Sequence, residues 1–569
     1  MVMENKEVAK ILYKVADFLE MEDNPFRPKA YRRAAHTIEF LSENLDDIRK
    51  KGQLEDLPGI GKNIAQKIEE ILDTGYLGYL EDLKLSVPVD FEALISVEGL
   101  GPKKIKQLYD ELGIKNLDDL EYMAKRHKIR RLKGMGEKSE KRILENIEFA
   151  RKHGSRKLLG YVLPLAESLK EILEKVEIID KVEVAGSIRR RKETIGDIDI
   201  LVITSHPRQV MDIFTKMNVV KEVISKGPSK STVRLNEGIE CDLRVFERDM
   251  FGAALMYFTG SKEINVELRR IAIQNNMKLN EYGLFKGKKR VAGVTESEIF
   301  HKLGMDYIEP ELRENRGEVK AAIEGKLPEL VDYDEIRGDL QMHSNWSDGS
   351  NSISDMAQTA SEIGHEYIAI TDHAGSLRIA QGLDEKRLEN QMNEIDKINE
   401  TFDEITILKG VEVNIGSDGK LDIKNEILND LDVVVASIHS GFRQEEEKIS
   451  YRLLKAMENE NVNIIGHPTG RKIQERRSYK LDLEKIYQSS IDNNVYLEIN
   501  SQPNRLDLND VNIKKAIERG CKLVVNTDAH SPQQLNHIDL GIATARRGWA
   551  GKKDIINTLS LKNLKKILN

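Results

Sequence analysis

The chain has 569 residues, a net charge of −8, 40% hydrophobic residues and 32% charged residues. One hydrophobic core rarely holds this length, so we expect three or four domains in a globular protein. Its two cysteines, Cys241 and Cys521, lie in separate apolar runs and are too few for a disulfide framework or a cysteine zinc site. The charged N-terminus lacks a signal core and no long apolar run follows, so we expect a cytoplasmic protein without a membrane segment.

The first 150 or so residues are expected to be helical, because apolar residues recur at three- and four-residue spacing. An apolar residue, a Gly-x-Gly turn and a helix start with basic residues recur together three times here. The glycines are Gly59, Gly61, Gly99, Gly101, Gly134 and Gly136. Such turns leave backbone N–H groups available for a nucleic-acid phosphate. The alternative is that they only cap helix–helix turns, but three regular copies and local basic clusters favour DNA binding.

Beyond residue 155, short β-branched runs alternate with helices. Asp197 and Asp199 are two residues apart on a predicted strand, so both carboxylates face the same side. Such carboxylates repel one another unless a cation lies between them, and two Mg²⁺ ions held in this way can serve a phosphoryl transfer. An Asp-x-Asp pair alone would be a solvated strand end. The upstream Gly186-Ser187 turn and a third aspartate, Asp242, favour a catalytic centre.

The motif Gly-Ser-x-Arg-Arg followed by Gly-Asp-x-Asp resembles the nucleotidyltransferase signature of family X DNA polymerases, such as DNA polymerase beta. The segment from Met256 to Phe285 looks like the part of that family that closes over the incoming nucleotide. The resemblance implies that Asp197, Asp199 and Asp242 hold Mg²⁺ and that Asp242 favours deprotonation of the primer 3′-hydroxyl. The nucleotide-binding residues that it implies are Gly186, Ser187, Arg190, Gly196 and Arg156 at the triphosphate, Tyr257, Phe258 and Gly260 at the sugar, and Asn265 and Arg269 at the nascent pair.

The first hairpin raises a second activity. By the same resemblance, Lys67 matches a lysine with which some family members form a Schiff base on an abasic-site sugar, and Tyr31 matches a supporting residue. Such chemistry needs a lysine that is deprotonated at neutral pH. Phe26, Asn63 and Tyr79 stand where the family has histidine or lysine. These departures favour the alternative, that Lys67 is an exposed basic residue on a DNA-facing helix.

After residue 340, most histidines and several acids follow apolar runs that are predicted strands. Alternating strands and helices predict parallel pairing in a barrel or a doubly wound sheet, with strand-end side chains converging on one rim. The candidate metal ligands are His343, Asp348, His373, Glu412, His439, His467, Asp528 and His530. These mixed nitrogen and oxygen donors suit Zn²⁺ or Mn²⁺, which activate water for attack on a phosphoester.

This set resembles the polymerase and histidinol phosphatase (PHP) domain, a distorted β/α barrel with a trinuclear metal site. The resemblance implies that one metal is held by His343, Glu412 and Asp528, a second by Glu412, His439 and His467, and a third by Asp348, His373 and His530. Gln341 stands where the motif normally has a histidine, so its amide oxygen replaces an imidazole as a weaker ligand. Arg471 is expected to contact a substrate phosphate.

The two resemblances cover nearly the whole chain and imply a multidomain fold. The expected domains are a helical, lyase-like DNA-binding domain with one hairpin (1–84), a helical DNA-binding subdomain with two more (85–153), an α/β nucleotidyltransferase palm (154–258), an α+β nucleotide-closing subdomain (259–316), a linker (317–336) and a PHP-type β/α barrel (337–569). The expected partners are gapped or nicked double-stranded DNA and deoxynucleoside triphosphates, bound by a monomer.

The implied function is template-directed filling of short gaps in DNA repair, with Mg²⁺ in the polymerase site. The PHP domain is expected to act on 3′ ends as a Mn²⁺- or Zn²⁺-dependent 3′–5′ exonuclease or phosphatase, and to cut at abasic sites. Two alternatives stay open: a polymerase whose PHP domain is weakened by Gln341 and acts structurally, and a DNA-end-binding scaffold. The hairpins disfavour a nucleotidyltransferase for small molecules or tRNA, and a phosphoesterase of small metabolites is the least favoured reading.

Overall fold

The computed structural model describes residues 5–21, 26–39, 41, 44–95, 97, 99–153, 156–375, 377 and 380–568. The chain divides into two compact units. The first comprises residues 1–155 with two short stretches, 349–352 and 474–477, and the second comprises the rest. Within the described ranges, no helix has the length and apolar character needed to cross a membrane.

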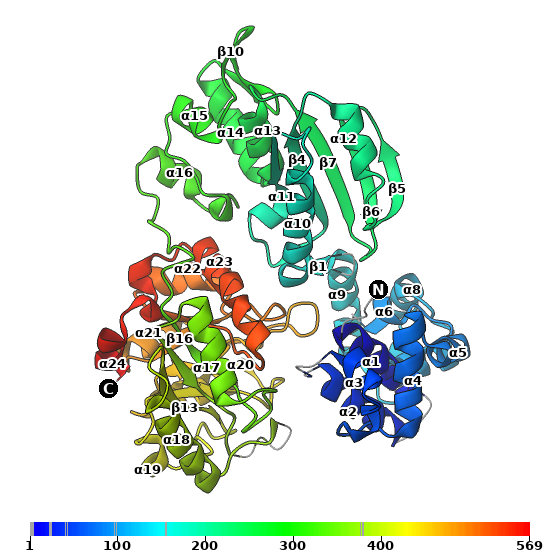
Figure 1. Ribbon diagram of the computed structural model, residues 1–569, viewed down its shortest axis with the longest axis vertical. Coiled ribbons are helices and arrows are strands. Elements are labelled where there is room, and N and C mark those ends of the chain that lie inside the picture. The colour runs from blue at the N-terminus through cyan, green and yellow to red at the C-terminus, as the bar shows by residue number, and fades with distance from the viewer. Residues whose placement is uncertain are drawn as a thin grey trace. The chain divides into compact units, whose positions relative to one another are not determined.

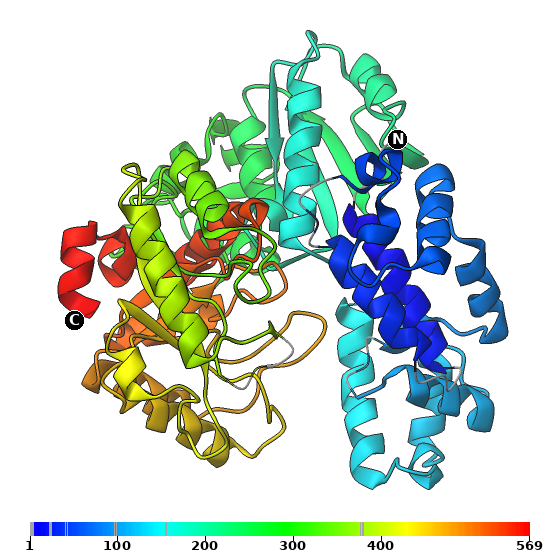
Figure 2. The same ribbon diagram turned by 60° about the horizontal axis from the view of Figure 1, so that its bottom comes forward.

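The first unit is built from helices, which run from blue to cyan in Figure 1 and Figure 2. They are α1 (Asn5–Met21), α2 (Arg27–Glu39), α3 (Leu45–Lys50), α4 (Lys62–Thr74), α5 (Gly78–Ser86), α6 (Phe91–Ile95), α7 (Pro102–Leu112), α8 (Leu117–Lys125) and α9 (Glu137–His153), with the 3-10 turns η1 (Leu54–Asp56) and η2 (Ile129–Arg131). Apolar residues at helical spacing face one core, in which Leu12, Ile38 and Ile68 are completely buried. The all-helical N-terminal region expected from the sequence is therefore confirmed.

Each Gly-x-Gly turn of this unit directly precedes a helix. The first glycines, Gly59, Gly99 and Gly134, have positive φ angles of 82°, 95° and 78°, a conformation that favours glycine. The second glycines, Gly61 and Gly101, are the N-caps of α4 and α7 and provide no side-chain cap. The first amide groups of these helices therefore have no capping side chain to bind them.

The second unit begins with a five-stranded sheet in the order β2-β4-β7-β6-β5. Its strands are β2 (Lys181–Val184), β4 (Asp197–Ile203), β5 (Val220–Lys226), β6 (Lys230–Leu235) and β7 (Glu240–Phe246), and β1 (Lys157–Leu158) and β3 (Thr194–Ile195) form a separate pair. Strands β4 and β7 are parallel neighbours. Alternate residues of β4 are buried in a core with helices α10 (Leu159–Glu174) and α12 (Pro207–Phe214).

A helical subdomain with a small antiparallel sheet follows. It contains α13 (Phe251–Thr259), α14 (Lys262–Gln274), β8 (Lys278–Asn280), β9 (Gly283–Lys286), β10 (Lys289–Ala292), α15 (Glu296–Lys302), η3 (Pro310–Leu312) and α16 (Glu318–Ile323). A buried ion-pair cluster joins it to the palm. The Glu296 carboxylate lies 2.6 Å from a nitrogen of Arg313, which is completely buried, and 2.6 Å from a nitrogen of Arg189. Such a buried charge requires this pairing.

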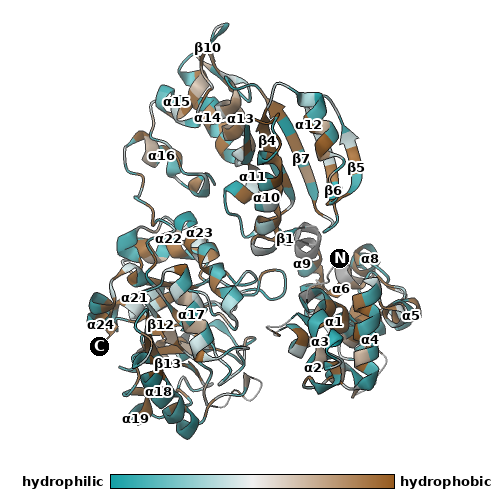
Figure 3. Cartoon of the chain, in the orientation of Figure 1, coloured by the Kyte–Doolittle hydropathy of each residue, from teal (hydrophilic) through white to brown (hydrophobic). Residues whose placement is uncertain are grey.

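The rest of the unit is a seven-stranded parallel sheet whose strands pair in chain order: β11 (Gly338–Met342), β12 (Tyr367–Ile370), β13 (Thr406–Asn414), β14 (Val433–Ser437), β15 (Ile464–Ile465), β16 (Tyr496–Asn500) and β17 (Leu523–Asn526). The helices are α17 (Ile353–Ile363), α18 (Glu385–Asn399), α19 (Asn425–Leu428), α20 (Glu446–Met457), α21 (Leu483–Asp492), α22 (Asp510–Arg519), α23 (Ile538–Arg547) and α24 (Leu561–Leu568), with η5 (Pro532–His537), η6 (Lys552–Asp554) and η7 (Ile556–Thr558). In Figure 3, β13 carries brown residues, whereas α18 is mostly teal. Helices thus shield apolar strands from water.

The first and last strands of this sheet meet. Met342 and Ala529 form a parallel bridge, and the His343 amide donates to the Ala529 carbonyl at 2.8 Å. The Asp528 amide donates to the Gln341 carbonyl at 3.0 Å. The sheet is therefore a nearly closed barrel, which confirms the distorted β/α barrel and the multidomain fold class expected from the sequence.

Candidate functional site

The first candidate site is a cluster of three carboxylates on the palm sheet. Strands β4 and β7 pair with Asp199 directly opposite Asp242, and Asp197 lies two residues earlier on the same face of β4. The parallel register therefore brings together the three aspartates predicted from the sequence.

The charges of this cluster are not balanced by the protein alone. Burial, together with the charges of Asp197 and Asp242, raises the pKa of Asp199 to about 7. Burial also acts to raise the pKa of Asp242, but hydrogen bonds from Lys230, at 2.8 Å, and Thr232, at 2.5 Å, hold it below its usual value. A divalent cation would relieve the repulsion at Asp199, so the donor set fits Mg²⁺.

The Gly-Ser turn lies directly against the Asp199 carboxylate. Gly186 has a positive φ of 64°, and a Cβ at this position would lie 2.6 Å from Oδ2 of Asp199. A larger residue would therefore both strain the backbone and displace the carboxylate. Ser187 follows in the short helix α11 (Gly186–Arg189), so the predicted turn and the predicted aspartates form one site.

The two arginines predicted to bind the triphosphate are held by other groups of the protein. Arg190 donates to the Glu314 carboxylate at 3.0 Å and to the Thr259 carbonyl at 2.5 Å. Arg156 donates to the Thr194 hydroxyl at 3.0 Å, and its guanidinium lies 3.0 Å from the place that a Cβ on Gly196 would occupy. The role of Glu314 was missed by the sequence analysis, since this glutamate lies in a charged stretch without a motif.

The residues predicted to contact the sugar and the nascent pair lie along α13 and α14. The rings of Tyr257 and Phe258 lie edge to face, with their centres 5.1 Å apart. The Asn265 side chain donates to the Tyr257 carbonyl at 2.7 Å, and Arg269 donates to the Asn265 carbonyl at 3.1 Å. Gly260 ends α13 with a positive φ of 69°. Tyr257, Asn265 and Arg269 are thus linked by a chain of hydrogen bonds.

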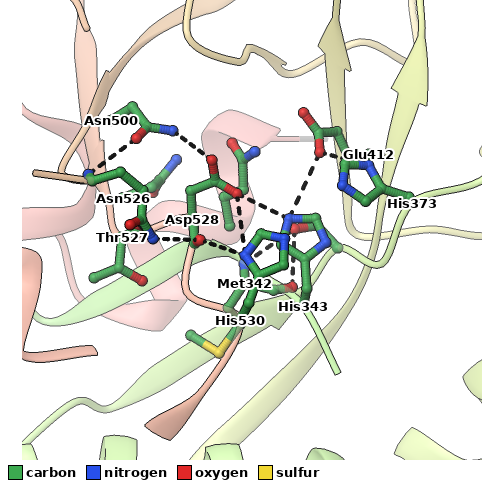
Figure 4. A network of polar contacts seen from close by, with 12 residues as sticks. Met342, His343, His373, Glu412, Asn500, Asn526, Thr527, Asp528 and His530 are labelled. Carbon is green, nitrogen blue, oxygen red and sulfur yellow. Dashed lines mark hydrogen bonds and ion pairs between the residues drawn. The ribbon is translucent and has the colours of Figure 1, made fainter. Parts of the chain in front are cut away.

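The second candidate site lies at the carboxyl ends of the barrel strands (Figure 4). Glu412, on β13, is at its centre. One carboxylate oxygen lies 3.0 Å from Nδ1 of His373, and the other lies 3.3 Å from Nε2 of both His439 and His467. Nε2 of His343 lies 3.7 Å from the same glutamate. Four predicted histidines thus surround one buried acid.

The remaining predicted ligands continue this cluster. Nε2 of His343 lies 3.1 Å from Oδ1 of Asp528, and Oδ1 of Asp348 lies 3.5 Å from Nε2 of His530. Three groups have ligand atoms within 4.8 Å of one another: His343, Asp348, His373 and His530; His373, Glu412 and His439; and His343, Glu412 and Asp528. The grouping differs from the expected sets in three ways: His343 joins Asp348, His373 and His530; His373 also joins Glu412 and His439; and His467 belongs to none of the three groups, although it lies 3.3 Å from Glu412.

Burial and mutual charge shape the ionisation of this cluster. Glu412 is 1% exposed, yet the charges of His373 and His439 outweigh its burial and hold its pKa far below the usual value. Burial would lower the pKa of His530, but the hydrogen bond with Asp348 raises it to about 9. At His467, burial and the charge of a nearby arginine lower the pKa to about 4. The neutral imidazole is the form that binds a metal ion.

Gln341, the departure from the family motif, is completely buried at the end of β11. Among the described residues, neither Oε1 nor Nε2 of its amide has a hydrogen-bond partner, and the Ser437 hydroxyl also lacks one. A Cβ on Gly466 would lie 3.4 Å from Oε1 of Gln341 and would clash with the Ser437 hydroxyl, so these groups meet beside His467. Orphaned buried polar atoms are costly, and they fit a cation or a bound water at this place.

A layer of buried polar residues supports the ligands (Figure 4). The His467 amide donates to Glu498 at 2.6 Å, and Asn526 donates to the same carboxylate at 3.0 Å. Asn500 donates to Asp528 at 3.0 Å. Glu498 and Asn500 were not predicted from the sequence, although they are two residues apart on a predicted strand and so share one face near the rim.

Arg471, expected at a substrate phosphate, is 9% exposed and bound within the protein. It donates to the Leu506 carbonyl at 2.6 Å and lies 2.8 Å from the Glu193 carboxylate of the palm. The structure therefore places Arg471 where the barrel meets the palm.

In the first unit, Lys67 and Tyr31 both contact the ring of Tyr79. Nζ of Lys67 lies 4.9 Å from the centre of the Tyr79 ring, which stacks on Tyr31 with a centre-to-centre distance of 6.4 Å. Arg27 donates to the Tyr79 hydroxyl at 2.8 Å. Arg27 thus supplies a cation close to the positions where the family's histidine and lysine are missing.

The second unit therefore combines two chemistries, those of a nucleotidyltransferase and of a metal-dependent phosphoesterase. Family models match the chain in the order of a helix-hairpin-helix domain (3–77), a SAM-like helix-hairpin-helix tandem (91–148), the DNA polymerase beta thumb (254–314) and the PHP domain (339–502).

Similar proteins span both halves. The chain is 38% identical to the DNA polymerase/3′-5′ exonuclease PolX of Bacillus subtilis (strain 168), over 100% of this chain and 99% of that protein. It is 27% identical to DNA polymerase lambda of Arabidopsis thaliana, over 54% of this chain and 62% of that one. It is 28% identical to the probable phosphatase Teth514_1060 of Thermoanaerobacter sp. (strain X514), over 37% of this chain and 84% of that one. The chain belongs to the family X DNA polymerases that carry a PHP domain.

Proposed function

We propose that the protein fills short gaps in DNA by template-directed addition of deoxynucleotides and trims 3′ ends with its PHP domain. The polymerase assignment is supported by the register of β4 and β7, in which Asp199 lies opposite Asp242 and two residues after Asp197, and by the approach of Gly186 to Asp199. We infer that it works as a monomer in the cytoplasm, on gapped or nicked DNA.

In the polymerase site, the three aspartates would hold Mg²⁺, which when bound stabilises charge on the attacking and leaving oxygens of the phosphoryl transfer. Asp242 stays ionised because Lys230 and Thr232 bind it, so it can accept a hydrogen bond from the primer 3′-hydroxyl. The triphosphate would be bound by Ser187, by backbone groups at Gly186 and Gly196, and by Arg190 and Arg156. Tyr257, Phe258 and Gly260 would line the sugar, with Asn265 and Arg269 at the minor-groove side of the new pair.

In the PHP site, the eight clustered residues would hold Mn²⁺ or Zn²⁺, which supply an activated water for attack on a phosphoester. Glu412 is ionised and His467 is neutral near pH 7, the forms that bind a metal ion, whereas His530 would have to release a proton on binding one. Glu498 and Asn500 orient these ligands through His467 and Asp528. We propose 3′–5′ exonuclease or 3′-end phosphatase activity for this site, with abasic-site cleavage as a further reaction.

The hairpins would bind the DNA backbone. A Cβ on Gly61, Gly101 or Gly136 would meet nothing within 4 Å, so packing inside the described protein does not require glycine there. A close approach by a DNA strand to the exposed amide groups does require it. Lys67, beside Arg27 and Tyr79, would add a positive charge to this surface, and we favour that role over Schiff-base chemistry.

The test is extension and trimming of a one-nucleotide gapped duplex, measured with Mg²⁺ or Mn²⁺ and with or without nucleotides. Replacing Asp197 and Asp199 by alanine should abolish extension and leave DNA binding and trimming. Replacing His439 and His467 by alanine should stop trimming and leave extension. Extension that persists in the first variant would refute the polymerase site, and unchanged trimming in the second would refute the PHP site.

A further inference from the structure

Helix α23 of the barrel ends in two buried arginines, Arg546 and Arg547, which are 8% and 5% exposed. Both reach the end of the polymerase part, but their partners differ. Arg546 donates to Glu311 at 2.8 Å. Arg547 donates to Glu314 at 3.2 Å and to the main-chain carbonyl of Arg190 at 2.5 Å. A barrel side chain thus touches the turn assigned to the triphosphate.

Glu314 connects Arg547 to the guanidinium of Arg190. Its carboxylate accepts a hydrogen bond from Nε of Arg190 at 3.0 Å and lies 3.4 Å from Nζ of Lys192. The Glu314 side chain is only 12% exposed, so its charge requires compensation at all times. An Arg190 guanidinium that turned toward a triphosphate would leave this carboxylate, and Arg547 and Lys192 would then balance its charge.

Arg547 itself is fixed from the barrel side. Its second terminal nitrogen donates to the Asp510 carboxylate at 2.6 Å, at the start of α22. Asp510 also lies 3.0 Å from a nitrogen of Arg316. Arg547 therefore has one partner in its own domain and two in the polymerase part, and its position depends on the contact between the two domains.

We propose that Arg547 is a positioning residue for nucleotide addition. By holding Glu314 and the Arg190 carbonyl, it allows the Arg190 guanidinium to exchange its ion pair for the triphosphate of the incoming nucleotide. This inference rests on the proposed function, which assigns Arg190 to the triphosphate. The barrel then contributes to nucleotide affinity in the polymerase site, in addition to its own chemistry.

The test is the kinetics of single-nucleotide gap filling by the full-length protein. Arg547→Ala should raise the KM for the nucleotide roughly 5- to 50-fold, with a smaller change in kcat, because Glu314 then keeps only Lys192 besides Arg190 and holds Arg190 more strongly. Arg547→Lys should restore part of the affinity. Adding Glu314→Gln to Arg547→Ala should return the KM to within about threefold of the parent, because the amide no longer retains Arg190.

Arg546→Ala is the matched control, because it removes an equally buried arginine from the same helix end without touching Arg190. It should leave the KM unchanged. A KM that rises no more in Arg547→Ala than in Arg546→Ala would overturn the proposal, as would failure of Glu314→Gln to rescue it. If Arg547→Ala does not fold, the KM values of Arg547→Lys and Glu314→Gln for the nucleotide test the proposal in its place. An unchanged KM in Arg190→Ala would instead overturn the assignment of Arg190 in the proposed function.

Discussion

Asp199 is a residue whose ionisation opposes folding in the absence of a metal ion. Burial and the neighbouring carboxylates raise its pKa from 3.8 to about 7, so the unfolded chain loses this proton at lower pH than the folded chain. The stability that this group contributes is complete below about pH 4 and is lost as the pH rises toward 7. At pH 8 the metal-free protein therefore carries an unfavourable charge that a cation would neutralise.

We expect Asp199→Asn to stabilise the metal-free second unit at pH 8 by on the order of 3 kcal/mol and to have little effect at pH 4. The amide has a similar shape without the charge. Mg²⁺ should stabilise the parent more than the variant, since an uncharged amide is a weaker ligand than a carboxylate. Thermal unfolding in a chelator and with Mg²⁺ across this pH range measures both effects. Equal Tm values for parent and variant at pH 8 in the chelator would contradict the expected repulsion.

Gln341 offers a second prediction. Its buried amide has no partner among the described residues, so Gln341→Leu, which removes the polar atoms at similar volume, should stabilise the metal-free protein by about 1–2 kcal/mol. The same change should weaken Mn²⁺ binding about 10-fold or more, by analogy with the loss of a supporting group at a metal site. Chemical unfolding and metal titration measure the two effects. A variant that binds Mn²⁺ as tightly as the parent would show that Gln341 serves packing alone.

The chemistry-bearing residues could be predicted because they are uncommon types in fixed patterns, such as Asp197 and Asp199 on one strand. Their partners could not be predicted, because 32% of the chain is charged and contacts depend on distant segments. Glu314 meets Arg190 across 124 positions of the sequence. The contact of Arg471 with Glu193 of the palm is another pairing between distant segments that the motif next to Arg471 does not predict.

At the scale of elements, helices α4 and α7, which follow Gly-x-Gly turns, begin at glycine N-caps, which provide no capping side chain. Gly61, the N-cap of α4, has a φ of −95°, which other residues tolerate, and no described residue lies within 4 Å of the place of its Cβ. Alternation of strands and helices predicted a parallel sheet but left a barrel and an open sheet as alternatives. The contact between Met342 and Ala529 that closes the barrel is a long-range pairing, which local patterns do not contain.

If the hairpins bind DNA, a substitution in a Gly-x-Gly turn should weaken DNA binding without lowering the stability of the protein. Gly61→Asp should leave stability unchanged or raise it slightly, because aspartate is a favourable N-cap. It should weaken DNA binding several-fold, because a carboxylate then faces the phosphate, and the loss should shrink at high salt. Asn116→Asp is the control, since it adds the same charge at the N-cap of α8, outside the Gly-x-Gly turns. Binding of gapped DNA across a salt series is the measurement, and equal losses in both variants would count against the hairpin interface.

At the scale of the whole molecule, the palm and the barrel share a core within the second unit. Ile473, Leu506 and Leu540 of the barrel belong to the same buried cluster as the palm strands. Gly160 marks how closely they approach, since a Cβ there would lie 2.8 Å from Pro503 and 2.9 Å from Leu540. Each of the two catalytic domains is therefore expected to be stabilised by its contact with the other.

Leu540→Ala tests this coupling. The cavity should cost about 2–5 kcal/mol, and hydrogen exchange should become faster in both palm strand β4 and barrel strand β16. Ile395→Ala, at a completely buried position in another core cluster of the barrel, is the control. Its effect should be larger in the barrel than in the palm. Faster exchange confined to the barrel in Leu540→Ala would mean that the palm is stable by itself.

The meeting of the first and last barrel strands has a consequence for synthesis. His343 and Asp528, which lie 3.1 Å apart, are separated by 185 positions in the sequence. During translation the palm aspartates are complete long before Asp528 and His530 leave the ribosome. A nascent or prematurely terminated chain would therefore contain all three polymerase aspartates but lack some of the metal ligands of the barrel. Without these ligands the barrel site would be inactive, so an incomplete chain would not degrade DNA.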